Sequence, residues 1–153
     1  MSVRMSEDEA WQVLHDAHTG ILTTLRRDGM PITLPIWFVA FDRSIWFAAP
    51  SRTKKVARIR HDPRASFLVE SGERWAELRA VHLTGRVEIV EDPATIERID
   101  RALDEKYAAF RTARAAMPDA TQRHYAGRTF FRLVPDDRIL SWDNRRIPIG
   151  GTS

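Results

Sequence analysis

The residues best suited to chemistry in this sequence are Ser51, Arg52, Thr53, Lys54 and Lys55. They follow an apolar, strand-like segment and precede a stretch with helical character. A helix N-terminus presents free backbone N–H groups, and hydroxyls and cations add further donors, so such a junction suits a phosphate. The chain has three lysines against 21 arginines, and two of the three lie here. Taken alone, the pattern fits an exposed, solvated helix start equally well.

A second candidate segment consists of Leu34, Pro35, Ile36 and Trp37. Proline cannot donate a hydrogen bond to a neighbouring strand, so Pro35 indicates a sheet edge, a bulge or an irregular point where backbone groups are free to meet a ligand. Trp37 supplies flat apolar surface of the kind on which an aromatic ligand packs. The alternative for this segment is ordinary core packing.

Familiar catalytic and metal-binding motifs are absent from the sequence. The five histidines have no ligand spacing, so no metal site is expected. Neither a nucleophile elbow, a Walker loop nor a dinucleotide-binding glycine motif occurs. The sequence therefore predicts no catalytic side chain, which fits chemistry carried by a bound redox cofactor.

Composition limits the class of protein. A chain of 153 residues with 43% hydrophobic residues and five tryptophans is expected to fold as one domain with a real core. The absence of cysteine excludes disulfides, thiolate metal sites and cysteine nucleophiles, and fits a cytoplasmic location. A net charge of only +3 argues against a nucleic-acid partner. No apolar run approaches the roughly 20 residues of a membrane span, so no membrane partner is expected.

The elements that would position these residues are mostly strands. Ser6 and Glu9 form a capping box that begins a helix, and Asp92 with Pro93 begins another. Strands are expected at 21–25, 33–41, 45–48, 65–69, 78–90, 129–134 and 138–142, and helices at 7–20, 53–61, 93–117 and 121–125. Short antiparallel strands favour a mainly β barrel with two to three peripheral helices. Residues 1–146 form the domain, and 147–153 a flexible tail.

The order and spacing of several short motifs resemble the pyridoxamine 5'-phosphate oxidase-like FMN-binding split barrels, in particular the flavin/deazaflavin-dependent oxidoreductases. The likeness covers roughly residues 7–143. The motifs that carry it lie at 20–24, 28–31, 35–38, 45–47, 51–55, 60–66 and 85–87.

This resemblance implies a six-stranded antiparallel split barrel and a homodimer with two cofactor sites at the subunit interface. It also implies FMN or coenzyme F420, a deazaflavin, as the hydride carrier. The tricyclic ring would be bordered by Leu34, Pro35, Ile36 and Trp37. The phosphate would be held by Ser51, Arg52, Thr53, Lys54 and Lys55, and Trp142 and Arg145 would approach from the other end of a strand.

The leading functional hypothesis is an oxidoreductase in which reduced F420 passes a hydride to an unsaturated or conjugated small molecule. Arg145 and Arg146 do not reproduce the C-terminal basic pattern of true pyridoxamine-phosphate oxidases, which disfavours that substrate. One alternative is an FMN-dependent reductase or oxidase of the pyridoxamine-phosphate-oxidase type. Another is a flavin- or haem-binding protein without turnover.

Overall fold

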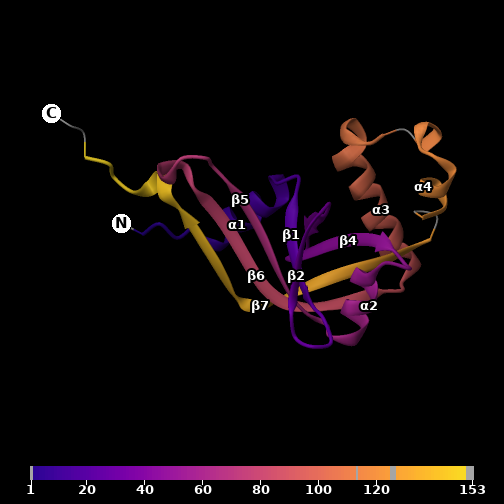
Figure 1. Cartoon of the computed structure of the whole chain (residues 1–153). Helices are drawn as coiled ribbons and strands as arrows, with labels where there is room; N and C mark the ends of the chain where they lie inside the picture. Colours follow the sequence, from indigo (N-terminus) through magenta and orange to yellow (C-terminus); the bar gives the residue numbers. More distant parts are fainter. Residues whose placement is uncertain (1, 113, 125–126, 151–153) are drawn as a thin grey trace.

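A single curled antiparallel sheet forms the body of the protein (Figure 1). The computed structural model describes residues 2–112, 114–124 and 127–150. The strand order is β2-β1-β5-β6-β7-β4-β3, and helices cover the ends of the sheet. The strands are β1 (Gly20–Leu25), β2 (Pro31–Ile36), β3 (Val39–Phe41), β4 (Ser44–Pro50), β5 (Arg64–Ser71), β6 (Arg79–Val90) and β7 (Arg128–Asp143). The α-helices are α1 (Glu7–Asp16), α2 (Lys54–His61), α3 (Pro93–Tyr107) and α4 (Asp119–His124).

The sheet closes on itself through a two-residue connection. One continuous strand was expected at 33–41, but the segment divides at Trp37 and Phe38. β2 pairs with β1 at one edge of the sheet, and β3 pairs with β4 at the other edge. Because only two residues join the two edges, the sheet must curl into a barrel. The seven strands therefore correspond to the predicted six-stranded split barrel, with one strand divided between two partners.

A bulge bends the two longest strands, β6 and β7. Their register shifts between Leu83 and Gly85, opposite Pro135. A Cβ at Gly85 would lie 2.1 Å from the Val134 carbonyl oxygen, so this close approach requires glycine. Gly85 thus marks a β-bulge between β6 and β7. The predicted break at 135–137 is wrong, because β7 continues through it and Asp136 accepts a hydrogen bond from Thr84 at 2.8 Å.

The helices at Ser6 and Asp92 begin at their capping signals, but α1 ends at Asp16 rather than near residue 20, and α3 is also shorter than expected. Ser6 caps α1 in a capping box and Asp92 caps α3. The predicted helix at 93–117 ends at Tyr107, and short 3-10 turns follow: η2 (Ala108–Phe110) and η3 (Arg114–Ala116). Phe110 is 61% exposed, so the apolar stripe that would hold further turns against the sheet is missing beyond Tyr107. The short helix near 121–125 appears as α4, and Tyr125 lies outside the described residues.

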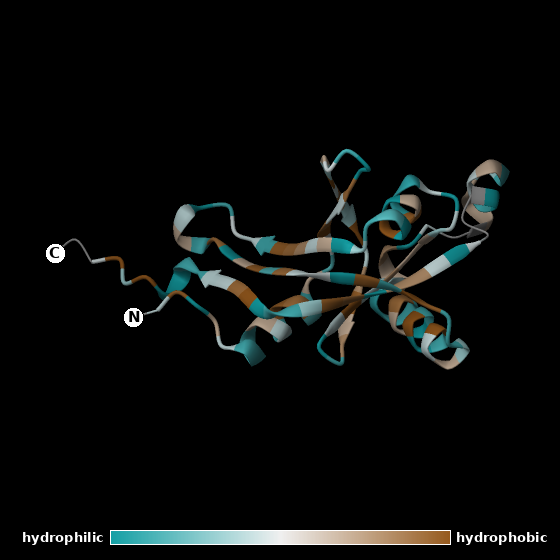
Figure 2. Cartoon of the chain, turned by 90° about the horizontal axis from the view of Figure 1, so that it is seen from below, coloured by the Kyte–Doolittle hydropathy of each residue, from teal (hydrophilic) through white to brown (hydrophobic). Residues whose placement is uncertain are grey.

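Two hydrophobic clusters fill the interior. The larger lies between the curled sheet, α1 and α2, and includes Leu14, Phe38, Phe47, Phe67 and Phe131. The smaller lies between α3 and the β3–β4 pair and centres on Trp46, Ile99, Leu103, Tyr107 and Phe130. Hydrophobic colouring follows the long strands and the inner helix faces, whereas turns are hydrophilic (Figure 2).

Two short 3-10 turns lie at one end of the sheet. The 3-10 turns η1 (Trp75–Glu77) and η4 (Asn144–Arg146) lie at the end of the sheet where both termini emerge (Figure 1). Of the predicted flexible tail 147–153, residues 151–153 lie outside the described residues, and its flexibility stays a prediction. No described helix is long and apolar enough to cross a membrane.

Candidate functional site

The turn between β4 and α2 is held by backbone and hydroxyl contacts. The Ser51 N–H donates to the Gly127 carbonyl at 3.0 Å, and the Ser51 and Thr129 hydroxyls are 2.8 Å apart. Both the N–H and the hydroxyl of Thr53 donate to the Pro50 carbonyl, at 3.1 and 2.9 Å. These bonds fix the path of the chain into the helix and leave Arg52 and Lys54 exposed.

The N-terminus of α2 lacks the side-chain cap that the other long helices have. Ser6 and Asp92 accept hydrogen bonds from the first turns of α1 and α3, whereas the Thr53 hydroxyl is turned back to Pro50. The first turn of α2 also contains no acidic residue. The first backbone N–H groups of a helix have no intrahelical acceptor, so those of α2 remain available to an anion.

Positive charge accumulates at the start of α2. Within the described part of the chain, none of Arg52, Lys54, Lys55 and Arg58 takes part in an ion pair. Burial, and secondarily the nearby Arg58, lower the pKa of Lys55. A cation in such a place gains more from a bound anion than a solvated one does.

Arg58 joins this group through β1. Its Nε donates to the hydroxyl of Thr24 at 2.9 Å, and Thr24 is buried. The guanidinium is thereby held close to Lys55. The helical spacing of three residues between Lys55 and Arg58 was the sequence signal for this proximity.

The predicted ring-bordering segment lies at the free edge of β2 and in the connection to β3. Leu34, Pro35 and Trp37 are exposed, which confirms that Pro35 marks a sheet edge, whereas the Ile36 side chain is buried in the core. The indole of Trp37 is 40% exposed and stacks on Tyr107, with ring centroids 4.3 Å apart and planes 4° apart. One face of Trp37 is therefore covered by its own chain.

Trp142 and Arg145 lie far from the turn in the same chain. Pro50 pairs with Arg128 at the start of β7, whereas Trp142 pairs with Ala80 fourteen positions further along the strand. At about 3.3 Å per residue, the bent strand between them is roughly 46 Å long. One chain thus brings Ser51 and its neighbours together but not Trp142 and Arg145 with them.

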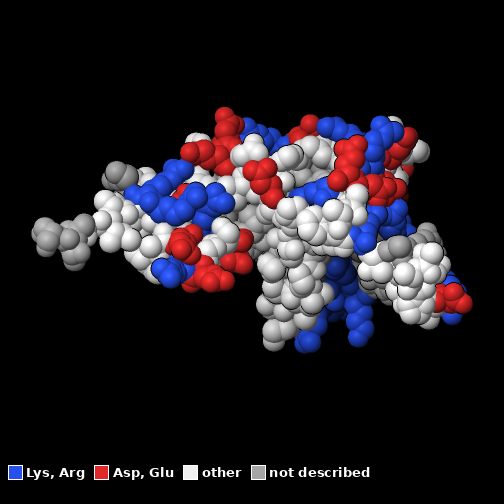
Figure 3. Space-filling view, turned by 90° about the horizontal axis from the view of Figure 1, so that it is seen from above, with Lys and Arg blue, Asp and Glu red and all other residues white. Residues whose placement is uncertain are grey.

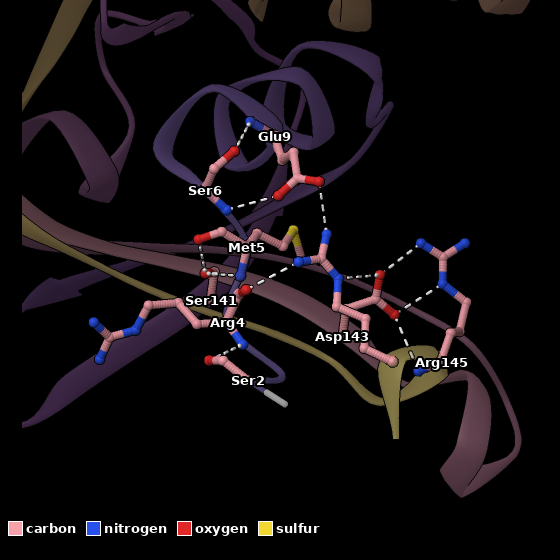
Figure 4. Close-up of polar contacts among 9 residues, drawn as sticks. Ser2, Arg4, Met5, Ser6, Glu9, Ser141, Asp143 and Arg145 are labelled. Atoms are coloured by element: carbon pink, nitrogen blue, oxygen red, sulfur yellow. Dashed lines mark hydrogen bonds and ion pairs between the residues drawn. The ribbon is translucent and has the colours of Figure 1, made fainter. Parts of the chain in front are cut away.

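Arg145 is engaged at the end of the sheet where the termini emerge. Its guanidinium donates to Asp143 at 2.8 and 2.7 Å (Figure 4). This hydrogen bonding holds the pKa of the Asp143 carboxyl at about 2, although burial opposes the shift. Arg146 binds Glu9 at 2.8 Å and so ties the end of the chain to α1. The role predicted for Arg145 stays a prediction.

The sequence predicted neither a metal site nor a nucleic-acid partner. Within residues 2–112, 114–124 and 127–150, no cluster of three or more possible ligands is arranged for a metal ion. On the face in Figure 3, blue and red side chains are interspersed rather than gathered into one field of a single sign. At the turn before α2, Arg52, Lys54, Lys55 and Arg58 lie close in sequence and have no acidic partner among the described residues.

Comparison with known proteins gives the family. Residues 6–139 match the family described as pyridoxamine 5'-phosphate oxidase. No curated protein sequence matches the chain.

Solved structures agree with that match. The conserved hypothetical protein Rv2991 from Mycobacterium tuberculosis is 31% identical, with a TM-score of 0.82 over 99% of this chain and 93% of the other. A FAD-binding protein (mll6688) from Mesorhizobium loti, 20% identical, has a TM-score of 0.68 over 90% and 93% of the two chains. An F420 reductase, 23% identical, has a TM-score of 0.63 over 84% and 94%. The chain therefore belongs to the pyridoxamine 5'-phosphate oxidase-like family of flavin-binding split barrels.

Proposed function

We propose that the protein is a cytoplasmic oxidoreductase that uses reduced F420 to transfer a hydride to an unsaturated or conjugated small molecule. The observation that carries the proposal is the uncapped N-terminus of α2 beside Arg52, Lys54 and Lys55, which have no acidic partner among the described residues. Family membership supports a flavin-related cofactor, and the fold is shared with an F420 reductase.

The residues of the turn fit a phosphate by their donor chemistry. Ser51 offers a hydroxyl, Arg52 a planar set of N–H donors, and Lys54 and Lys55 ammonium groups. The free backbone N–H groups of α2 add donors that need no side-chain movement. Each of these groups donates, so a group made of acceptor oxygens is the natural partner.

The edge of β2 fits the apolar ring system of such a cofactor. Leu34, Pro35 and Trp37 place apolar surface at a strand edge, and Trp37 is fixed from behind by Tyr107. When bound, the cofactor supplies the hydride. The chain's own part is to hold the phosphate, to border the ring and to exclude water from the side on which the acceptor binds.

A second copy of the chain would complete this site. Trp142 is 38% exposed and Leu140, two residues earlier on the same face of β7, is 54% exposed. In a homodimer this face would bring Trp142 and Arg145 toward the partner's turn, which a single chain does not do. A homodimer with two shared sites thus accounts for apolar surface that the monomer leaves exposed.

FMN is the second candidate cofactor, because its phosphate would meet the same donors. A FAD-binding protein of the same fold supports a conventional flavin. The third candidate is a flavin- or haem-binding carrier, which would bind a cofactor without consuming an acceptor. Each candidate predicts a different result with the purified protein.

The test starts with the visible spectrum of the protein as purified, followed by titration with F420 and with FMN. The proposal predicts that the purified protein shows no flavin absorbance band. It also predicts that the protein, at micromolar concentration, quenches or shifts the fluorescence of added F420. It also predicts that reduced F420 is oxidised only when a conjugated acceptor is present. A yellow protein that does not bind F420 would favour FMN as the cofactor. Cofactor binding without consumption of an acceptor would favour a carrier.

A further inference from the structure

A groove lies between α3 and β3, away from the turn before α2. It has a volume of about 720 Å³ and is lined by both elements together with His15 of α1. It shares no lining residue with the turn before α2. Its floor is apolar, formed by Val39, Ala40, Phe41 and Ala102, and its rim is charged.

Lys106 enters this groove from α3 in an unusual setting. Its Nζ donates to the Phe38 carbonyl oxygen at 3.0 Å and lies 4.0 Å from the centre of the Phe38 ring. No carboxylate lies within ion-pair distance of Nζ among the described residues. An ammonium group has three donors, so two of its N–H bonds have no acceptor among the described residues.

Burial lowers the pKa of Lys106 to about 8, and the more distant Asp16 opposes the shift only in part. The groove wall also carries charged or titratable groups from both helices: His15 from α1, and Glu97, Arg98, Arg101 and Glu105 from α3. A fraction of Lys106 is thus a neutral amine near neutral pH, whereas an ordinary solvated lysine is almost wholly protonated.

Two arginines stand on the rim of the same groove. Arg98 pairs with Asp42 at 2.8 Å, and its guanidinium lies 4.0 Å from the centre of the Phe41 ring. Arg101 pairs with Glu97 at 2.8 Å. All four of these side chains are more than half exposed, and exposed ion pairs contribute little stability. Either guanidinium can therefore exchange its partner for the carboxylate of a ligand.

We propose that Lys106 is a nucleophilic amine that condenses reversibly with small aldehydes bearing a carboxylate, bound in the groove between α3 and β3. The Nζ lone pair attacks the carbonyl carbon and forms a carbinolamine. Loss of water, which takes the carbonyl oxygen and the two amine hydrogens, leaves a C=N bond. Nothing is oxidised or reduced. The apolar floor receives the body of the aldehyde, and Arg101 or Arg98 receives its carboxylate. This site does not depend on the redox function proposed above.

The test compares Lys106 with the other two lysines of the chain, Lys54 and Lys55, as internal references. The wild-type protein is incubated at pH 8 with 4-formylbenzoate, and sodium cyanoborohydride reduces any imine to a stable amine that peptide mass spectrometry assigns to a residue. Labelling of Lys106 is expected to be at least about tenfold faster than that of exposed Lys54, because burial lowers the pKa of Lys106 and leaves more of its amine neutral at pH 8. Equal or slower labelling of Lys106 would overturn the proposal.

A second comparison separates the groove from simple amine reactivity. Lys55 is also half-buried with a lowered pKa but lies at the turn before α2. Arg101→Ala should slow labelling of Lys106 by 4-formylbenzoate several-fold while leaving Lys55, and labelling by uncharged benzaldehyde, unchanged. If Arg101→Ala and Arg98→Ala both leave the rate at Lys106 unchanged, the groove does not recognise the carboxylate and the proposal fails.

Discussion

The phenol ring of Tyr107 lies parallel to the indole of Trp37, with ring centroids 4.3 Å apart, and the Tyr107 hydroxyl binds the backbone of Phe38, the residue that follows Trp37. It accepts from the Phe38 N–H at 2.9 Å and lies 2.8 Å from the Phe38 carbonyl and 2.7 Å from that of His18. Trp37 and Phe38 are the two residues that join the edges of the sheet. The last residue of α3 thus holds the closure of the barrel and fixes one wall of the proposed ring site.

Tyr107→Phe tests this role in stability. The substitution keeps the ring but leaves the buried N–H of Phe38 without its partner, so the free energy of unfolding should fall by about 1–3 kcal/mol. Urea denaturation of both proteins measures the change. Phe110→Leu, an exposed aromatic three residues later, is the matched control and should change stability by less than about 0.5 kcal/mol. Equal small effects of the two substitutions would show that the Tyr107 hydroxyl does not hold the barrel closed.

Lys106→Met should change how stability depends on pH. The pKa of Lys106 is about 8 in the folded chain and 10.5 for an ordinary lysine, so between these values the unfolded chain binds more protons. Stability of the wild type should therefore rise with pH from about 8 to about 10.5 relative to the variant, and be level outside that window. Denaturation at a series of pH values gives both curves. Parallel curves would mean that burial of the ammonium costs nothing.

Asp143 should make the free energy of unfolding depend on pH in the acidic range, whereas Lys106 does so in the basic range. Its pKa is lowered from 3.8 to about 2, so its contribution is complete above pH 4 and is lost as the pH falls toward 2. Asp143→Asn should remove about 2 kcal/mol of stability at neutral pH, and the difference from wild type should shrink below pH 4. Acid titration followed by far-UV circular dichroism measures it. A difference that does not depend on pH would point to packing rather than charge.

Mixing two defective variants tests the shared site of the proposed homodimer. If Lys55→Ala and Trp142→Ala each weaken cofactor binding, a mixed dimer contains one site with both defects and one with neither. Co-expressed chains should therefore recover tight binding that neither variant has alone. Failure to recover it, with both variants folded and dimeric, would mean that Trp142 acts in its own chain or not at all.

The sequence predicted most of the strands because their hydrophobic patterns are local. It did not predict the division at Trp37 and Phe38, since both halves have high β propensity and the change of partner is decided by the curl of the whole sheet. The end of α3 at Tyr107 was missed for a similar reason. The segment after it has good helix formers, but no surface of the sheet lies beneath it.

The candidate site divides in the same way. The turn from Ser51 to Lys55 could be proposed from its residue types alone, because adjacent residues form it, and its role as a phosphate site stays a prediction. The residues that contact this turn or its cations, Thr129 and Thr24, come from distant strands, and no local sequence pattern points to them. The same is true of Tyr107, which stacks behind Trp37. Contacts of this kind depend on sheet register, which is fixed only when every strand is in place.

The most direct test of the central claim is the effect of Lys55→Ala on the affinity for F420. Lys55 should contribute about 1–3 kcal/mol through a charge-assisted contact with the phosphate, so the dissociation constant from fluorescence titration should rise about 5- to 150-fold. Arg74→Ala, an exposed cation in the loop after β5, is the control and should bind as wild type does. If Lys55→Ala binds F420 as tightly as Arg74→Ala, the turn before α2 is a solvated helix start and not the phosphate site.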